Sequence, residues 1–162
     1  MKENFEIERK FLIEYPSQEA LGGAEYAEIT QTYLTAPKNE ERRVRRIKKG
    51  SNVIYFKTSK KRVSDVKRIE EEQEITESEY LTLLKDADPK KHTIKKTRYL
   101  VPFDGRVFEI DVYPFWGDKA IAEVELKDEN EDIIFPDFIK IIKEVTDDSR
   151  YKNAALSENI PK

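Results

Sequence analysis

The sequence predicts a mainly β fold of the α+β class: an eight-stranded antiparallel closed β-barrel, or tunnel, with a few flanking helices. Three observations support this prediction. At 162 residues, the chain has the length of a single domain, which we place over residues 1–162. Apolar and charged residues alternate along most of it, with the period of two that β-strands have. Lys49-Gly50-Ser51 and Asp104-Gly105 are turn signals between such runs, as in antiparallel hairpins.

The predicted strands follow one another with short connections. The alternating runs predict strands at residues 5–15, 28–34, 42–48, 52–58, 68–75, 92–103, 106–113 and 120–127. Eight antiparallel strands can close into a barrel, which leaves no unpaired edge. Residues 60–67 are basic and are predicted to form a loop, and the tail after Asp147 is predicted to be a terminal strand or an extended segment.

Two segments change to the helical period. In residues 76–87 the apolar side chains fit one helical face, and Thr76 or Ser78 would cap the helix, with Glu79 in its first turn. Residues 136–145 begin with a proline and continue with apolar residues at helical spacing, which predicts a second helix. These helices would cover apolar surface on the outside of the barrel.

The composition argues against several classes of function. Hydrophobic residues make up 38% of the chain and charged residues 39%, but eight Tyr and eight Phe in periodic runs indicate a folded domain. A net charge of -3 gives little reason to expect nucleic-acid binding. The lack of Cys excludes disulfides and thiolate zinc sites. With no signal peptide and no apolar run near the roughly 20 residues that span a bilayer, we expect a cytoplasmic protein that binds no membrane.

Charge gathers on one side of the predicted strands. Phe108, Ile110 and Val112 share one side of their strand, whereas Glu109 and Asp111 share the other. The same pattern recurs at Glu6, Glu8 and Lys10, at Arg43 and Arg45, at Glu70, Glu72 and Glu74, at Lys96 and Arg98, and at Glu123 and Glu125. A solvated outer face is the simpler interpretation of any single pair. For the whole set we interpret the charged side as the barrel interior, where buried charges need water, a metal ion and an anion as partners.

These residues match the motifs of a known family. Glu6-Ile7-Glu8-Arg9-Lys10 resembles the ExExK signature of the CYTH superfamily, also called triphosphate tunnel metalloenzymes. Matching stretches follow in order at residues 43–46, 55–58, 68–75, 96–99, 108–111, 122–126 and 144–151, so that the resemblance runs from Phe5 to about Asn153. Gln31-Thr32-Tyr33-Leu34 and Lys96-Thr97-Arg98-Tyr99 look most like the short bacterial branch.

The resemblance implies an eight-stranded tunnel that hydrolyses triphosphates with Mg²⁺ or Mn²⁺, and inorganic triphosphate is the typical substrate of the short branch. It also implies a catalytic pair, Lys96 and Tyr33, near the scissile phosphate, although Tyr33 could equally be a packed barrel tyrosine. Arg150 could reach the tunnel from the tail or lie on the surface.

The charged residues suit this chemistry by their own properties. Arginine matches phosphate oxygens bidentately and lysine adds a compact charge. The predicted substrate-binding residues are Lys10, Arg43, Arg45, Lys57, Arg98 and Arg150, with Lys96 beside them. Mg²⁺ takes one or two carboxylates together with phosphates and water. The predicted metal ligands are Glu6, Glu8, Glu70, Glu72, Glu74, Asp111, Glu123 and Glu125.

Three other functions stay open at this point. An adenylate cyclase of the same superfamily would make cyclic AMP from ATP, a thiamine triphosphatase would cleave another triphosphate, and a non-catalytic binder would hold polyphosphate or nucleotide without turnover. The many carboxylates argue against the binder, because an anion binder has little use for them. Uncovered apolar positions on the outer barrel would favour a homodimer.

Overall fold

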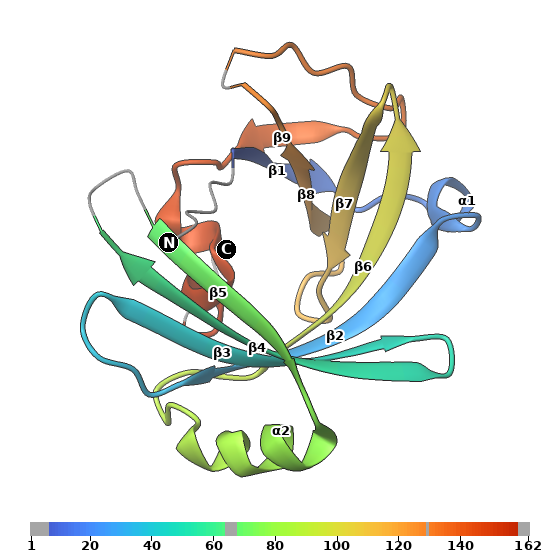
Figure 1. Cartoon of the computed structure of the whole chain (residues 1–162). Helices are drawn as coiled ribbons and strands as arrows, with labels where there is room; N and C mark the ends of the chain where they lie inside the picture. Colours follow the sequence, from blue (N-terminus) through green and yellow to red (C-terminus); the bar gives the residue numbers. More distant parts are fainter. Residues whose placement is uncertain (1–6, 64–67, 129, 159–162) are drawn as a thin grey trace. The chain divides into compact units, whose positions relative to one another are not determined.

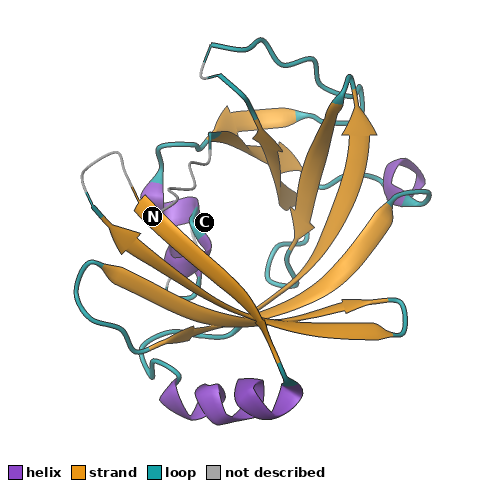
Figure 2. Cartoon of the chain, viewed as in Figure 1, coloured by secondary structure: helices purple, strands orange, loops and turns teal. Residues whose placement is uncertain are grey.

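A computed structural model describes residues 7–63, 68–128 and 130–158 of the chain (Figure 1). The chain divides into two compact units. The first unit contains Ile29–Ile94 and the residues from Lys152 onward, and the second contains Glu6–Glu28 and Lys95–Tyr151. Strands are the main regular elements of both units, as the orange arrows of Figure 2 show.

The second unit is built on antiparallel strands. β6 (Ile94–Phe103), β7 (Arg106–Val112), β8 (Lys119–Glu125), β1 (Glu8–Glu14) and β9 (Ile141–Glu144) lie side by side in that order, and the start of β2 (Glu25–Leu34) belongs to the same unit. The pairs β6 and β7, β7 and β8, β8 and β1, and β1 and β9 are all antiparallel. The short helix α1 (Gln18–Leu21) is capped by Ser17, and the 3₁₀ turn η2 (Ser149–Tyr151) ends the unit.

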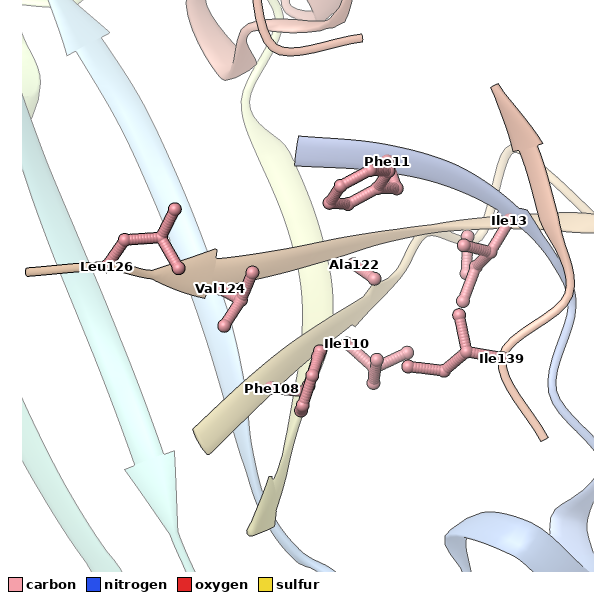
Figure 3. Packing of buried hydrophobic residues seen from close by; sticks show 9 residues of the cluster. Phe11, Ile13, Phe108, Ile110, Ala122, Val124, Leu126 and Ile139 are labelled. Carbon is pink, nitrogen blue, oxygen red and sulfur yellow. The ribbon is translucent and has the colours of Figure 1, made fainter. Parts of the chain in front are cut away.

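Apolar side chains of this unit gather on one face of the sheet. Figure 3 shows Phe11 and Ile13 of β1 close to Ala122 and Val124 of β8, with Ile110 of β7 beside them. Most of these residues are buried because every second residue of each strand points to the same face. The opposite face of the same strands therefore carries the residues of the other parity.

The first unit has the strand order β5-β4-β3-β2, with β3 (Glu40–Lys49), β4 (Asn52–Arg62) and β5 (Arg68–Ile75). The helix α2 (Glu77–Leu83) follows β5 and leads into the 3₁₀ turn η1 (Leu84–Asp86), and α3 (Asn153–Leu156) comes from the end of the chain. Tyr80 of α2 packs with Val44, Ile75 and Leu34 in a second apolar core. The α2 helix thus covers one face of β3 and β4.

The start of α2 is as the sequence predicts. Thr76 is the N-cap and accepts a hydrogen bond from the Glu79 backbone N–H, while the Glu79 side chain accepts one from the Thr76 backbone. This reciprocal capping box satisfies two N–H groups that the first helical turn would otherwise leave unpaired.

The mainly β antiparallel fold with few helices is confirmed, but two predicted segments are wrong. The predicted helix at residues 136–145 is a turn at Pro136 followed by strand β9, which pairs with β1. Its apolar spacing fits a helix and a strand alike, and the edge of β1 supplied the pairing that decided between them. The tail after Asp147, predicted to be a terminal strand or an extended segment, instead contains η2 and α3. The described residues thus hold nine strands instead of eight.

Three other fold predictions concern barrel closure, the loop at 60–67 and membrane-spanning segments. Closure into a barrel and the single-domain organisation stay predictions. Of the predicted loop at 60–67, residues 60–62 belong to β4, and residues 64–67 lie outside the described residues. Across the described ranges, none of the helices is long and apolar enough to pass through a bilayer.

Candidate functional site

The second unit carries charged residues on the face of its sheet opposite the apolar core. The strand register places Lys10 opposite Glu123, Glu109 opposite Glu123, and Arg98 opposite Asp111. Directly opposed residues of neighbouring strands point to the same side of a sheet. Glu8, Lys10, Lys96, Arg98, Glu109, Asp111, Glu123 and Glu125 therefore share one face, as the alternation in the sequence predicts.

A closed ion cluster occupies the centre of this face. Asp111 is fully buried, and its two oxygens accept hydrogen bonds from Lys96 Nζ at 2.9 Å and from Arg98 at 2.7 and 2.9 Å. Burial alone would raise the pKa of Asp111, but Lys96 and Arg98 outweigh burial and hold it below its usual range. Asp111 is thus a counter-ion for two cations, with both oxygens engaged.

Lys96 is the buried cation of this cluster. Its side chain is 1% exposed, and the Tyr113 ring lies 6.0 Å from its nitrogen. Burial lowers the pKa of Lys96 to about 8, although the Asp111 carboxylate partly offsets the effect. A lysine with such a pKa has an appreciable neutral fraction at mildly alkaline pH and can then accept a proton.

Carboxylates lie beside the ion cluster. Glu123 is buried and pairs with Lys10 at 3.2 Å, and Glu109 pairs with Arg98 at 2.9 Å. Burial raises the pKa of Glu109, against the effect of Arg98. Glu8 stands opposite Glu125, and Glu109 stands opposite Glu123.

These opposed carboxylates suit a divalent cation. Like charges directly opposite each other destabilise a sheet unless a cation lies near them. Among the described residues, no three acidic or histidine side chains are close enough to hold a metal ion by themselves. Mg²⁺ commonly takes one or two carboxylates and completes its shell with substrate phosphates and water. The donor set thus fits an ion that binds together with a phosphate substrate.

The first unit also carries charge on the face opposite its core. The register places Arg43 opposite Thr58 and Thr58 opposite Glu72, so these side chains share a face with Arg45. One oxygen of Glu72 accepts hydrogen bonds from Arg45 at 2.8 Å and from Thr58 at 2.9 Å. The predicted Arg43 and Arg45 pair is therefore brought together with a predicted carboxylate.

Lys57 does not join these arginines. It stands opposite Val44 and Gln73, on the face that α2 covers, and it is exposed. Lys60 takes the place that Lys57 was predicted to fill, because it shares the parity of Thr58 and lies 4.0 Å from Glu70. The sequence predicts a loop at Lys60, and extending the alternation of the predicted strand 52–58 by two residues identifies it.

Tyr33 lies in a buried polar environment of the first unit. It is 2% exposed, and its hydroxyl oxygen accepts a hydrogen bond of 2.6 Å from the Gln31 side-chain amide. Burial raises the pKa of Tyr33 to about 12, and Glu41 adds to the rise while Arg43 opposes it. Tyr33 is therefore protonated at ordinary pH. Gln31 was not among the predicted site residues.

The remaining predicted residues are placed as follows. Glu6 lies outside the described residues, and Glu74 is exposed on β5. Arg150 is exposed and pairs with Asp148 two residues away, at 2.6 Å. Lys96 and Tyr33 belong to different units, so their pairing stays a prediction.

The chain is similar to proteins that hydrolyse triphosphate. The model of the CYTH domain family matches residues 4–154. An inorganic triphosphatase of Acetivibrio thermocellus is 35% identical over 157 residues, which cover 95% of this chain and 94% of that protein. An inorganic triphosphatase of Nitrosomonas europaea is 34% identical over 160 residues, covering 96% of this chain and 99% of that protein. A crystal structure of an inorganic triphosphatase has a TM-score of 0.64 and 32% identity, and covers all of both chains.

Proposed function

The chain belongs to the CYTH domain family, and on that premise we propose that it is a divalent-metal-dependent triphosphate hydrolase whose preferred substrate is inorganic triphosphate. Two inorganic triphosphatases that match nearly the whole chain at about a third identity support the substrate. The observation that carries the proposal is the charged face of each unit, where cations and carboxylates alternate opposite an apolar core.

Each unit carries cations suited to binding phosphate. Arg43 and Arg45 offer guanidinium groups that match phosphate oxygens, and Lys60 replaces Lys57 in this role because it shares their face. Lys10 and Arg98 serve in the second unit. We leave Arg150 out, because its guanidinium is exposed and bound to Asp148. The proposal needs positioned charge and little covalent protein chemistry, as phosphoryl transfer generally does.

One or two carboxylates of the set Glu8, Glu109, Glu123 and Glu125 would hold the metal ion together with phosphate oxygens and water, and Glu6 is a further ligand predicted from the motif. A bound Mg²⁺ or Mn²⁺ would neutralise charge on the phosphate oxygens. Asp111 no longer counts as a ligand, because both of its oxygens accept hydrogen bonds from Lys96 and Arg98. Glu70, Glu72 and Glu74 stay predicted ligands on β5, of which Glu72 also fixes Arg45.

Lys96 would accept a proton from a reacting group, whereas Tyr33 would donate a hydrogen bond to one. The neutral form of Lys96 can accept a proton, since burial lowers its pKa to about 8. Tyr33 keeps its proton and can only stabilise charge by donating a hydrogen bond, since burial raises its pKa to about 12. The two residues therefore divide the roles of base and hydrogen-bond donor.

Phosphate release tests the proposal. Purified protein is incubated with inorganic triphosphate, ATP or thiamine triphosphate, with Mg²⁺, with Mn²⁺ or with chelator. We expect metal-dependent cleavage that is fastest for inorganic triphosphate, and a loss of about 100-fold or more in Glu123→Gln, because one carboxylate of the metal set is gone. Glu19→Gln is the matched control, since Glu19 is an exposed acid on α1. Absence of cleavage of all three substrates by the wild-type protein would refute the proposal.

The same assay separates the other functions. Cyclic AMP from ATP would indicate a cyclase, preference for thiamine triphosphate would indicate a thiamine triphosphatase, and tight anion binding without turnover would indicate a binder. The cytoplasmic location, the lack of a nucleic-acid or membrane partner and the homodimer stay predictions from the sequence.

A further inference from the structure

A buried amide beside Tyr33 has half of its hydrogen-bonding groups unused. Gln31 is 1% exposed, and its Nε2 donates to the Tyr33 hydroxyl at 2.6 Å. Its carbonyl oxygen Oε1 is buried, and within the described part of the chain it has no hydrogen-bond partner. Buried acceptors are nearly always satisfied in folded proteins, because leaving one unpaired is costly. An amide that folding does not satisfy points to a ligand that donates a hydrogen bond.

A second buried group near Tyr33 is a hydrogen-bond donor that lacks an acceptor. Arg43 Nε, a donor, is also buried without a hydrogen-bond partner among the described residues. Arg43 is close enough to Tyr33 to oppose the rise in its pKa. A triphosphate offers only acceptor oxygens when ionised, so it can satisfy Arg43 but not Gln31. Gln31 therefore requires something other than the ionised phosphates.

The other reactant of a hydrolysis is water, which donates two hydrogen bonds. We propose that Gln31 orients the water molecule that attacks the triphosphate, with Oε1 accepting one of its hydrogen bonds. This inference rests on the proposed function. The water oxygen would bond to the terminal phosphorus as the anhydride P–O bond breaks and pyrophosphate leaves, and one water proton would pass to a general base. Gln31 would take no proton.

The same amide sets the direction of the Tyr33 hydroxyl. Because Nε2 donates to the hydroxyl oxygen, the Tyr33 proton points to a different acceptor, and a phosphate oxygen of the substrate is such an acceptor. Gln31 would thus hold water with its carbonyl and orient Tyr33 with its amide nitrogen. Both effects place reacting groups and leave substrate binding to the cations.

Two variants of Gln31 and one neighbour test the inference. Gln31→Leu removes both hydrogen bonds at similar size. Gln31→Glu keeps an acceptor but loses the amide donor when ionised. Thr32→Val is the matched control: Thr32 is the next residue on β2, is buried, and bonds to Thr93 through its hydroxyl. All are assayed as full-length protein for kcat and KM with inorganic triphosphate. Binding of imidotriphosphate, in which nitrogen replaces the bridging oxygens, is measured with Mg²⁺ by calorimetry.

For Gln31→Leu we expect kcat to fall about 100-fold, as for a misplaced reacting group, while KM and imidotriphosphate affinity change less than about threefold. Thr32→Val should keep wild-type kcat. A wild-type kcat in folded Gln31→Leu would overturn the inference, and so would a fall in kcat matched by an equal loss of imidotriphosphate binding. If Oε1 instead held the metal ion, the Mg²⁺ concentration needed for half-maximal rate would rise in Gln31→Leu, which also overturns it.

The pH profile of Gln31→Glu gives a signature that packing alone would not produce. A protonated glutamate resembles glutamine, with one donor for Tyr33 and one acceptor for water, whereas its carboxylate would accept the Tyr33 proton. The ratio of variant to wild-type kcat should therefore rise as pH falls. Glu41 and Arg43, which act on the Tyr33 hydroxyl, and Lys91, which lies over the Tyr33 ring, are the charged neighbours that set the midpoint. A ratio independent of pH would overturn the inference. Loss of wild-type turnover would instead refute the proposed function.

Discussion

The charged faces of the two units differ in how completely their buried polar atoms are hydrogen-bonded. In the second unit, Lys96 and Arg98 share the buried carboxylate of Asp111, whose two oxygens both accept hydrogen bonds from them. In the first unit, Arg43 Nε and Gln31 Oε1 are buried without hydrogen-bond partners in the described ranges. The second unit thus pairs its buried cations with a buried carboxylate, whereas the first, although Glu72 pairs with Arg45, keeps two buried polar atoms that the described residues leave without a partner.

This difference separates stability from binding. A closed ion cluster contributes to folding when all its members are present, and it sets the pKa values of its members. Unpaired buried polar groups lower the stability of the free protein, and a ligand that hydrogen-bonds to them offsets this loss when it binds. Substitutions in the second unit should therefore change unfolding and pH dependence first, and substitutions in the first unit should change substrate kinetics first.

The largest effect is expected for Asp111→Asn. Removing one partner of a buried ion cluster leaves uncompensated buried charge and costs about 3–5 kcal/mol. The free energy of unfolding, measured in urea, should fall by that amount. Glu109→Gln is the matched control, because Glu109 lies on the same strand and pairs with Arg98 but is one-third exposed. Equal stability of Asp111→Asn and wild type would refute the closed cluster.

Acid should have the same effect as that substitution. The folded-state pKa of Asp111 lies below its ordinary value, so its stabilisation is fully present above about pH 4. As pH falls through the folded-state pKa, protonation removes it. The acid loss of stability should therefore be smaller in Asp111→Asn than in wild type, and parallel acid curves for the two proteins would contradict this.

Arg43→Gln should have the next largest effect, and it should appear in kinetics. Loss of a charge-assisted hydrogen bond to phosphate costs about 1.5–3 kcal/mol, or roughly 10- to 100-fold in kcat/KM for triphosphate. The free energy of unfolding should change little, because the side chain is incompletely paired in the free protein. Urea unfolding and kinetics on the same samples test the contrast. A variant that loses stability but keeps kcat/KM would break the comparison between the units.

The sequence already contained most of this contrast. Alternation placed Lys96, Arg98 and Asp111 on the face opposite Phe108 and Ile110, and the register confirms that segregation. It succeeds because a strand alternates its side chains strictly, so that one correctly assigned strand assigns both faces. The start of α2 was also predictable from local spacing, because a capping box needs only two residues three positions apart.

Other features depended on contacts that alternation does not describe. Residues 141–144 became a strand because the edge of β1 was there to pair with them. The prediction of Lys57 rests on a motif-like stretch at residues 55–58, whereas the parity of β4 places Lys60, and not Lys57, on the face of Arg43. Gln31 carried no charge and no motif, so only its burial and unpaired oxygen in the fold reveal it.

A pH profile tests whether burial in the second unit lowers the pKa of Lys96. If neutral Lys96 is the base, kcat should rise about tenfold per pH unit and level off near its pKa of about 8. Lys96→Arg should remove the rise, because arginine stays protonated. Since the unfolded lysine has a pKa near 10.5, stability should also increase with pH between about 8 and 10.5. A rate that is flat from about pH 6 to 9 would exclude Lys96 as the base.

The smallest effect is expected for a pair of lysines on the same strand. Lys60 shares the face of Arg43, whereas Lys57 is exposed on the face that α2 covers. Lys60→Ala should raise KM for triphosphate about fivefold, a modest change because a lysine of this exposure is partly screened by water. Lys57→Ala should leave KM unchanged, since its side chain points away from the proposed site. Because both substitutions remove one positive charge from β4, general electrostatic attraction changes equally in the two variants. A larger KM for Lys57→Ala than for Lys60→Ala would mean that the substrate binds on the other face, and the assignment of the first unit's charged face would then be wrong.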